Sequence, residues 1–256
     1  MQFQLTDITN KKVIAWSNIT FSPKNTLYST KKLNIQLGKN YQIKKTNGYY
    51  HLFAKLKEKG QPAITLNLKL MPERSPLLIN KTGLLPMGNN TNSYYYSITR
   101  LSTSGTLSIQ GKVFHFHKAT SSSWMDHQWG DFVITHQNQW IWMGIRLNND
   151  TDINIVTAVD PKTQQLLGGI ANLLLPNGKT LYTTDFQLTP VPPKKNEGKY
   201  PLQYGLEIPI VKLKMTITSL APNQDKNGFW EGISDVTANQ DGKPVSGFAY
   251  TENTIR

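Results

Sequence analysis

The residues best suited to chemistry lie in one short segment, residues 123–130 (SWMDHQWG). Side chains alternate between the two faces of an extended strand, so Asp126 would share a face with Trp124, and His127 would share the other with Trp129. Burial beside an indole raises the pKa of a carboxyl group and suits it to deliver a proton. If one face lines a cavity, we expect Asp126, helped by His127, to protonate an alkene or an enol ether.

Aromatic and ionisable residues gather around this segment. A stretch of 28 residues holds four of the six Trp and four of the five His. The residues concerned are His115, His117, Trp124, Asp126, His127, Trp129, Asp131, His136, Trp140 and Trp142. An Asp–His pair can also be a hydrogen-bonded strut between domains, and tryptophans often close the ends of barrels. The residue types alone leave both interpretations open.

Several other kinds of chemistry lack the residues that they need. The chain has no cysteine, which excludes disulfides, thiolate metal sites and thiol nucleophiles. His115 and His117 could bind zinc only with a third ligand from elsewhere. No Gly-x-Ser-x-Gly motif, phosphate-binding glycine loop or dinucleotide motif occurs. Glu231 and Glu252 could form a glycosidase pair with Asp126 only at a suitable separation. We expect no metal and no cofactor.

The pattern that must position these residues is alternation of apolar and polar residues between turns, which is typical of β-strands. No stretch of a dozen residues has helical periodicity, so a barrel or a sandwich is expected. Asn177-Gly178 and Asp241-Gly242 favour tight hairpins. The expected strands are residues 31–37, 49–56, 63–70, 93–100, 105–110, 112–117, 139–147, 152–159, 166–175, 180–188, 204–208, 211–219, 228–236 and 243–250.

Two features of the chain bear on its domain organisation. The polar, proline-rich residues 190–199 are expected to form a long surface loop within the second half. A domain boundary is expected near residues 130–136, which gives an N-terminal domain of residues 1–134 and a C-terminal domain of residues 135–256. Residues 1–7 resemble the middle of a strand and not a signal peptide, so the natural protein could begin earlier.

The charge is strongly basic, with 28 Lys and Arg against 16 Asp and Glu and a formal net charge of +12. The basic residues form short pairs such as Lys31-Lys32, without a nucleic-acid-binding motif. A lysine-rich solvated surface accounts for them, and a weak attraction to anionic lipid or to a cell-wall polymer is the alternative. No apolar run approaches the roughly 20 residues of a membrane span. We expect a soluble protein, in the cytoplasm or exported, whose oligomeric state the sequence leaves open.

Residues 124–130 resemble the characteristic block of the carotenoid 1,2-hydratase family, also called the hydroxyneurosporene synthase or AttH-like family. Further blocks agree in order, and together the matches span about residues 77–252. These blocks are Ser93–Leu101 (SYYYSITRL), Trp140–Trp142, Tyr200-Pro201, Phe229–Gly232 and Gly247–Glu252. The chain lacks the Glu-Trp-Trp-Tyr block that family members usually carry near the N-terminus, so the first strands of the N-terminal domain are expected to be missing.

The resemblance implies an all-β fold of two lipocalin-like antiparallel β-barrel halves packed together. It implies cofactor-free addition of water to a carbon–carbon double bond of an isoprenoid, polyene or other lipid. Asp126 and His127 would be catalytic. The expected substrate-binding residues are Trp124, Trp129, Tyr96, Trp140, Trp142 and Trp230. Two alternatives remain, a lipid carrier without chemistry and a pericyclic cyclase on the same fold.

Overall fold

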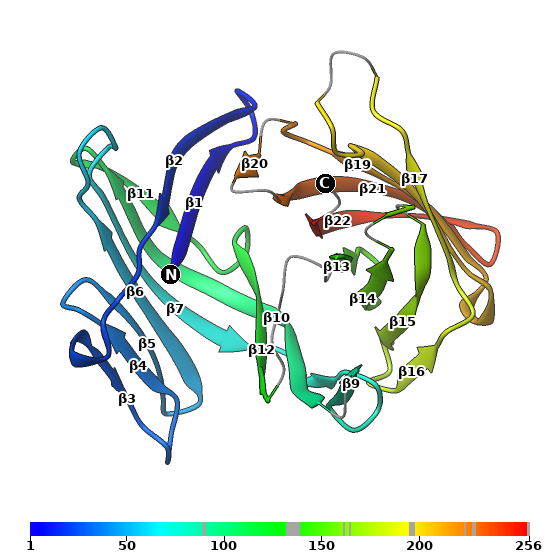
Figure 1. The fold of residues 1–256 in the computed structure, drawn as a ribbon, viewed down its shortest axis with the longest axis horizontal. Coiled ribbons are helices and arrows are strands. Elements are labelled where there is room, and N and C mark those ends of the chain that lie inside the picture. Colours follow the sequence, from blue (N-terminus) through cyan, green and yellow to red (C-terminus); the bar gives the residue numbers. More distant parts are fainter. Residues whose placement is uncertain are drawn as a thin grey trace. The chain divides into compact units, whose positions relative to one another are not determined.

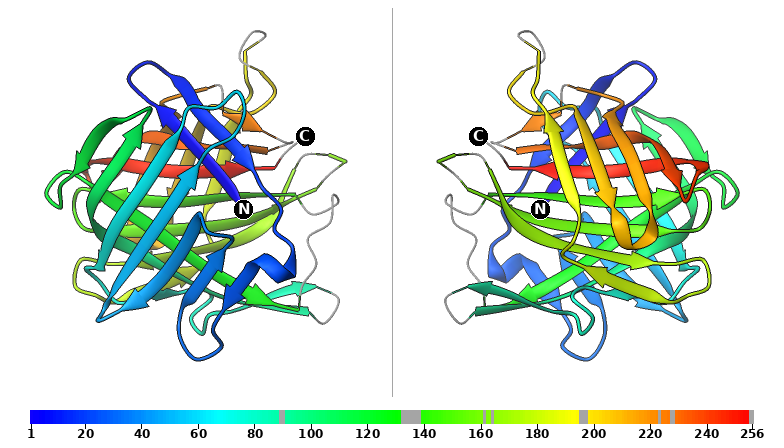
Figure 2. Two further views of the ribbon diagram at one scale, coloured as in Figure 1. Left: turned by 90° about the vertical axis from the view of Figure 1, so that its left-hand side faces the viewer. Right: turned by 90° about the vertical axis from the view of Figure 1, so that its right-hand side faces the viewer.

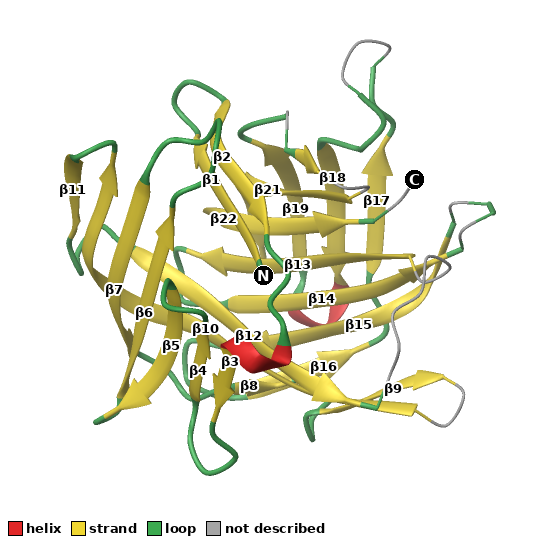
Figure 3. Cartoon of the chain, turned by 60° about the vertical axis from the view of Figure 1, so that its left-hand side comes forward, coloured by secondary structure: helices red, strands yellow, loops and turns green. Residues whose placement is uncertain are grey.

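Two curled antiparallel sheets account for most of the chain in the computed structural model (Figure 1). The structure describes residues 1–88, 91–131, 139–160, 162, 163, 165–194, 198–222, 224–226 and 229–254. Within these residues, helix is confined to two short 3₁₀ turns (Figure 3). The expected fold class, all-β with two lipocalin-like antiparallel halves, is confirmed. No helix among these residues is long and apolar enough to cross a membrane.

The chain divides into two compact units. The first unit comprises residues 1–7, 12–75 and 100–125, and the second comprises residues 8–11, 76–99 and 126–256. Two strands contribute residues to both units, β10 (Thr91–Ile109) and β12 (Ser122–Gly130). The boundary expected between residues 134 and 135 lies outside the described residues.

The first unit contains a two-stranded hairpin and a sheet in the order β11-β10-β7-β6-β5-β4-β3, in which β3 is an edge strand. Its other elements are β1 (Gln2–Asp7), β2 (Lys12–Asn18), a 3₁₀ turn (Pro23–Asn25), β3 (Thr26–Tyr28), β4 (Asn34–Leu37), β5 (Tyr41–Thr46), β6 (Tyr49–Leu56), β7 (Ile64–Pro72) and β11 (Lys112–Phe116). One of its core clusters is small, with Leu56, Ile64 and Leu107 among its members.

The second unit contains a sheet in the order β16-β15-β14-β13-β22-β21-β19-β18-β17. Its elements are β8 (Leu77–Leu78), β9 (Leu84–Gly88), β13 (Gln139–Leu147), β14 (Asp152–Val159), β15 (Leu166–Leu174), β16 (Thr180–Thr183), β17 (Gln187–Val191), β18 (Gln203–Ile208), a 3₁₀ turn (Pro209–Val211), β19 (Leu213–Ser219), β20 (Asp225–Lys226), β21 (Phe229–Gln240) and β22 (Lys243–Asn253). Figure 2 shows β22, in red, lying between β13 and β21, with which it pairs.

One face of the second sheet carries a continuous packed core. Alternate residues of β13, such as Ile141, Met143 and Ile145, are fully buried there. They belong to a cluster whose members come from strands between β15 and β17 along the sheet order, so the curled sheet closes on its own apolar side chains. The side chains that remain for chemistry therefore lie on the opposite face of this sheet.

The predicted strands are mostly found, but one turn was wrong. We expected strands at residues 93–100 and 105–110, whereas β10 runs without interruption through both. Gly105 has φ +137°, and a Cβ atom there would lie 2.0 Å from the carbonyl oxygen of Asn67 on the paired strand β7. This glycine permits a close approach of two backbones and does not mark a turn. The single strand expected at residues 180–188 is instead two, β16 and β17.

Candidate functional site

The block at residues 124–130 forms most of β12, which pairs with β10. Gly130 ends this strand at φ +157°, and a Cβ atom there would lie 2.1 Å from the carbonyl oxygen of Asn92. Only glycine fits this backbone approach, which explains the last residue of the block. The neighbouring side chains of β12 alternate as expected, so Asp126 and His127 lie in two different environments.

Asp126 accepts hydrogen bonds from two hydroxyl groups of β10. The Tyr95 hydroxyl donates to Oδ2 of Asp126, and the Ser97 hydroxyl donates to Oδ1 over 2.6 Å. Nδ2 of Asn154 donates to both hydroxyl oxygens, at 3.1 Å to Tyr95 and 3.3 Å to Ser97. Tyr95, Ser97 and Asn154 are buried, so this network fixes the orientation of the carboxylate.

The surroundings of Asp126 differ from our expectation. We expected a water-poor position beside an indole, whereas Asp126 is an exposed residue held by hydroxyl donors. Such donors suit an ionised carboxylate, which only accepts hydrogen bonds. Burial raises the pKa of Tyr95 well above its usual value, and the negative charge of Asp126 and the hydrogen bond to it raise it further. Tyr95 therefore remains a proton-bearing donor to Asp126.

A row of side chains crosses the second sheet on the face opposite its core. In the register of the paired strands, Trp142 of β13 lies opposite Glu252 of β22, which lies opposite Glu231 of β21. The indole N–H of Trp140 donates to Oε1 of Glu252 over 3.1 Å. The Tyr250 hydroxyl makes a longer contact of 3.4 Å to Oε2 of Glu231. Two carboxyl groups thus lie side by side, and each has a polar contact to an aromatic residue.

Both of these carboxyl groups are shifted toward the protonated form. Burial raises the pKa of Glu252 to about 7, and the negative charges of Glu231 and, to a smaller extent, Asp126 add to the rise. Burial also raises the pKa of Glu231, against which the Tyr250 hydroxyl acts. Because Asp126 contributes to the shift of Glu252, the three carboxyl groups form one electrostatically linked site. Near neutral pH this site can both give and accept a proton.

His127 lies on the other face of β12, in an aromatic cluster. Its Nδ1 lies 3.2 Å from the Tyr96 hydroxyl, and its ring centroid lies 4.6 Å from that of Trp129. Trp129 in turn stacks on Tyr94 at 5.6 Å. Burial lowers the pKa of His127, which favours the neutral ring. The structure therefore separates His127, Trp129 and Tyr96 from the carboxyl groups around Asp126.

The other predicted residues are divided between several places. Trp140 and Trp142 lie beside Glu252, as described above, and Trp142 also faces the Tyr95 hydroxyl. Trp230 lies on the core side of β21, is 1% exposed, and donates its indole N–H to the carbonyl oxygen of Pro222 over 2.9 Å. Its position is that of a structural residue, which differs from the expected substrate contact. Trp124 lies in the part of β12 that belongs to the first unit.

Comparison with known proteins places the chain in a family. The chain matches the AttH-like family over residues 1–254. It belongs to the AttH-like family. A search of curated proteins found no match. The resemblance expected from residues 124–130 is thus confirmed.

Two solved structures share the fold of this AttH-like protein. Kievitone hydratase from Nectria haematococca has a TM-score of 0.70 and 19% identity, over 86% of this chain and 70% of that one. A protein from Nitrosomonas europaea, solved under the name AttH, has a TM-score of 0.75 and 20% identity, over 99% of this chain and 80% of that one. These likenesses show the fold, which is that of a hydratase in the first case.

The histidines considered as zinc ligands of this AttH-like chain are described only in part. No group of three or more His, Asp or Glu side chains that could hold a metal ion occurs among the described residues. His115 and His117 lie together, with ring centroids 6.5 Å apart. His136 lies outside the described residues.

Several residues of the site were not among those predicted from the sequence. Tyr95 and Ser97 lie in the Tyr-Tyr-Tyr-Ser run, and strand alternation alone would have placed them on one face of β10. Glu252 and Glu231 were noted only as a conditional pair, because their register depends on the β21–β22 hairpin. Asn154 has no local feature that distinguishes it from other polar strand residues.

Proposed function

We propose that this AttH-like protein is a hydratase that adds water to a carbon–carbon double bond of an apolar small molecule without a cofactor. The observation that carries the proposal is Glu252, a carboxyl group with a pKa of about 7 beside a second carboxyl group and within the field of Asp126. A neutral carboxylic acid is the kind of donor that alkene protonation requires. The fold shared with kievitone hydratase supports this class of reaction.

The proposed reaction balances with water as the second reactant. Glu252 transfers its proton to one carbon of the double bond, and a carbocation forms at the other carbon. Water attacks this carbon, and its proton passes to Asp126, whose orientation Tyr95 and Ser97 hold. Proton exchange with solvent restores both groups. The product is an alcohol, and no redox change occurs.

The negative charge and the aromatic side chains near Glu252 are suited to stabilise the carbocation intermediate. A carbocation is stabilised by nearby carboxylates, here Asp126 and Glu231, and by the faces of aromatic rings. Trp140 and Trp142 are half-buried beside Glu252, and Tyr250 contacts Glu231. We therefore propose that these rings bind the substrate, in place of Trp230 and the cluster around His127. An apolar substrate fits them because they combine apolar faces with few polar donors.

The test is a search for water addition. Native mass spectrometry of the purified protein identifies any bound lipid, and a panel of isoprenoid and prenylated alkenes is incubated in ¹⁸O-labelled water. The expected result is an alcohol carrying the label, lost in Glu252→Gln and in Asp126→Asn. Asp235→Asn is the matched control, because Asp235 is an exposed carboxylate on the same face of β21 as Glu231. Binding of an alkene without turnover by the unaltered protein would contradict the proposal and favour a carrier.

A further inference from the structure

The net positive charge of the protein belongs to one of its two units. The first unit contains fifteen Lys and Arg against three Asp and Glu, and the second contains thirteen of each. The whole formal net charge of +12 therefore belongs to the first unit.

The strands of the sheet in the first unit carry lysines but no carboxylates. Its strands β3 to β7 and β11, and residues 100–109 of β10, contain no Asp or Glu. Strand register places Lys44, His51 and Lys69 in one row across β5, β6 and β7. Nζ of Lys69 lies 4.2 Å above the ring of Tyr49. One face of this sheet therefore carries basic side chains with an aromatic ring beside them.

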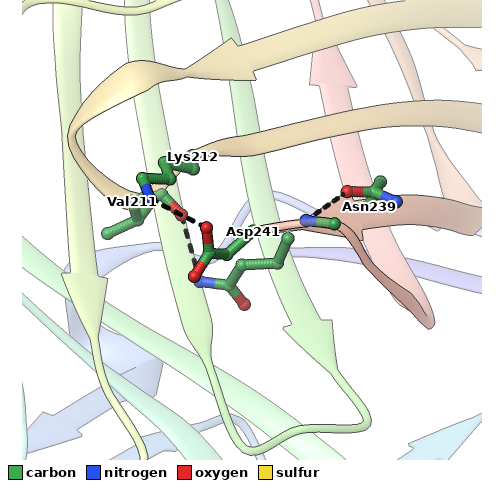
Figure 4. Close-up of polar contacts among 6 residues, drawn as sticks. Val211, Lys212, Asn239 and Asp241 are labelled. Carbon is green, nitrogen blue, oxygen red and sulfur yellow. Dashed lines mark hydrogen bonds and ion pairs between the residues drawn. The ribbon is translucent and has the colours of Figure 1, made fainter.

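In the second unit, several lysines instead pair with carboxylates. Nζ of Lys212 lies 2.8 Å from Oδ1 of Asp241, beside the hydrogen bond from Gly242 to Asn239 (Figure 4). Lys214 and Glu207 form a second pair at 2.9 Å. Because the second unit is neutral overall and pairs several of its lysines, an attraction to an anionic partner would involve the first unit.

The edge strand β3 carries two exposed side chains, and the strand register places Leu27 on the face of the Lys44 row and Tyr28 on the opposite face. Leu27 is 63% exposed and Tyr28 is 74% exposed. Three exposed lysines lie within a few residues of them along the chain, namely Lys24, Lys31 and Lys32. An edge strand with an exposed aliphatic and an exposed aromatic side chain, and with lysines close by along the chain, matches the interface of an anionic bilayer. There, rings enter the headgroup region and ammonium groups meet phosphates.

We propose that the β3 edge of the first unit, residues 24–32, docks on the surface of an anionic lipid bilayer. Leu27 and Tyr28 enter the headgroup region, while Lys24, Lys31 and Lys32 bind the lipid phosphates. A bilayer fits better than a nucleic acid, because the exposed aliphatic side chain of Leu27 gains nothing from a phosphate backbone. The docking does not depend on the proposed hydratase chemistry.

The test measures binding of the full chain to vesicles by sedimentation. We expect binding to phosphatidylglycerol-containing vesicles at low salt, at least about tenfold weaker binding to pure phosphatidylcholine, and loss at high salt. Lys31→Glu/Lys32→Glu should weaken binding about tenfold or more. Its control, Lys162→Glu/Lys179→Glu, makes the same charge change at exposed positions of the neutral second unit and should have little effect.

The apolar contribution has its own matched pair of variants. Leu27→Ser/Tyr28→Ser should weaken vesicle binding severalfold, whereas Val113→Ser/Phe114→Ser, at exposed positions of the strand β11 at the other end of the same sheet, should not. Circular dichroism checks that all variants are folded. The proposal is overturned if both charge variants weaken binding equally, if a polyanion such as heparin or RNA binds more tightly than the vesicles, or if no vesicle is bound.

Discussion

The two faces of β12 differ in the chemistry that their neighbours allow. On one face, Asp126 is held by Tyr95 and Ser97 and lies within the field of Glu252. On the other face, His127 lies among aromatic rings with a pKa lowered by burial. We therefore propose that Asp126 and His127 do not act as one catalytic pair, because strand alternation sends their side chains to opposite sides of β12.

The largest expected effect on turnover comes from a change on the face of β12 that carries Asp126, near Glu252. Glu252→Gln keeps the shape and the contact to Trp140 but removes the proton, so turnover should fall at least about 100-fold, as is typical when a general acid is lost. The measurement is the rate of alcohol formation at pH 7. Glu207→Gln, at a surface ion pair with Lys214, is the control and should turn over normally. Equal rates for Glu252→Gln and the unaltered protein would contradict the proposal that Glu252 is the proton donor.

The same carboxyl group should make stability depend on pH. The folded-state pKa of Glu252 is raised from 4.5 to about 7, so the folded state binds the extra proton, and stability falls as pH rises between these values. One pKa unit corresponds to about 1.4 kcal/mol, which makes the loss about 3 kcal/mol. Urea unfolding from pH 4.5 to 8 measures it. Glu252→Gln should flatten the curve, and an unchanged slope would contradict the assignment.

Tyr95→Phe tests the support of Asp126. The variant leaves Nδ2 of Asn154 and Oδ2 of Asp126 each without one hydroxyl partner in a buried network, which should cost about 1–3 kcal/mol of unfolding free energy. Thermal and urea unfolding measure this cost. Tyr94→Phe, at the exposed neighbour on the other face, should change stability by less than about 0.5 kcal/mol. Similar losses in both variants would show that the two faces do not differ.

The smallest effect on turnover is expected from a change on the opposite face of β12, where His127 lies among aromatic rings. His127→Gln removes a ring that contacts Tyr96 and Trp129 but reaches none of the three carboxyl groups, so turnover should change by less than about threefold. The rate is measured over pH 5–9. A loss comparable to that of Glu252→Gln would restore the Asp126–His127 pair as the catalytic unit.

The sequence was sufficient for the fold class, the strand pattern and the family, because each is carried by local alternation, turn residues and a specific block. The sequence also identified Asp126 as a candidate site residue, but it did not identify the residues that interact with Asp126. Glu252 and Glu231 meet through a hairpin register, and Asn154 reaches Tyr95 and Ser97 across 57 to 59 residues of chain. Gly105 looked like a turn because a close backbone approach and a turn both require glycine.

The central claim is that Glu252 carries a proton near neutral pH, and infrared spectroscopy tests it most directly. The carboxylic acid C=O band is recorded from pH 3 to 9 for the unaltered protein, and the spectra of Glu252→Gln are subtracted. The account predicts a difference band that disappears with a midpoint near pH 7. A midpoint near 4.5, the ordinary value for a glutamate, would contradict it.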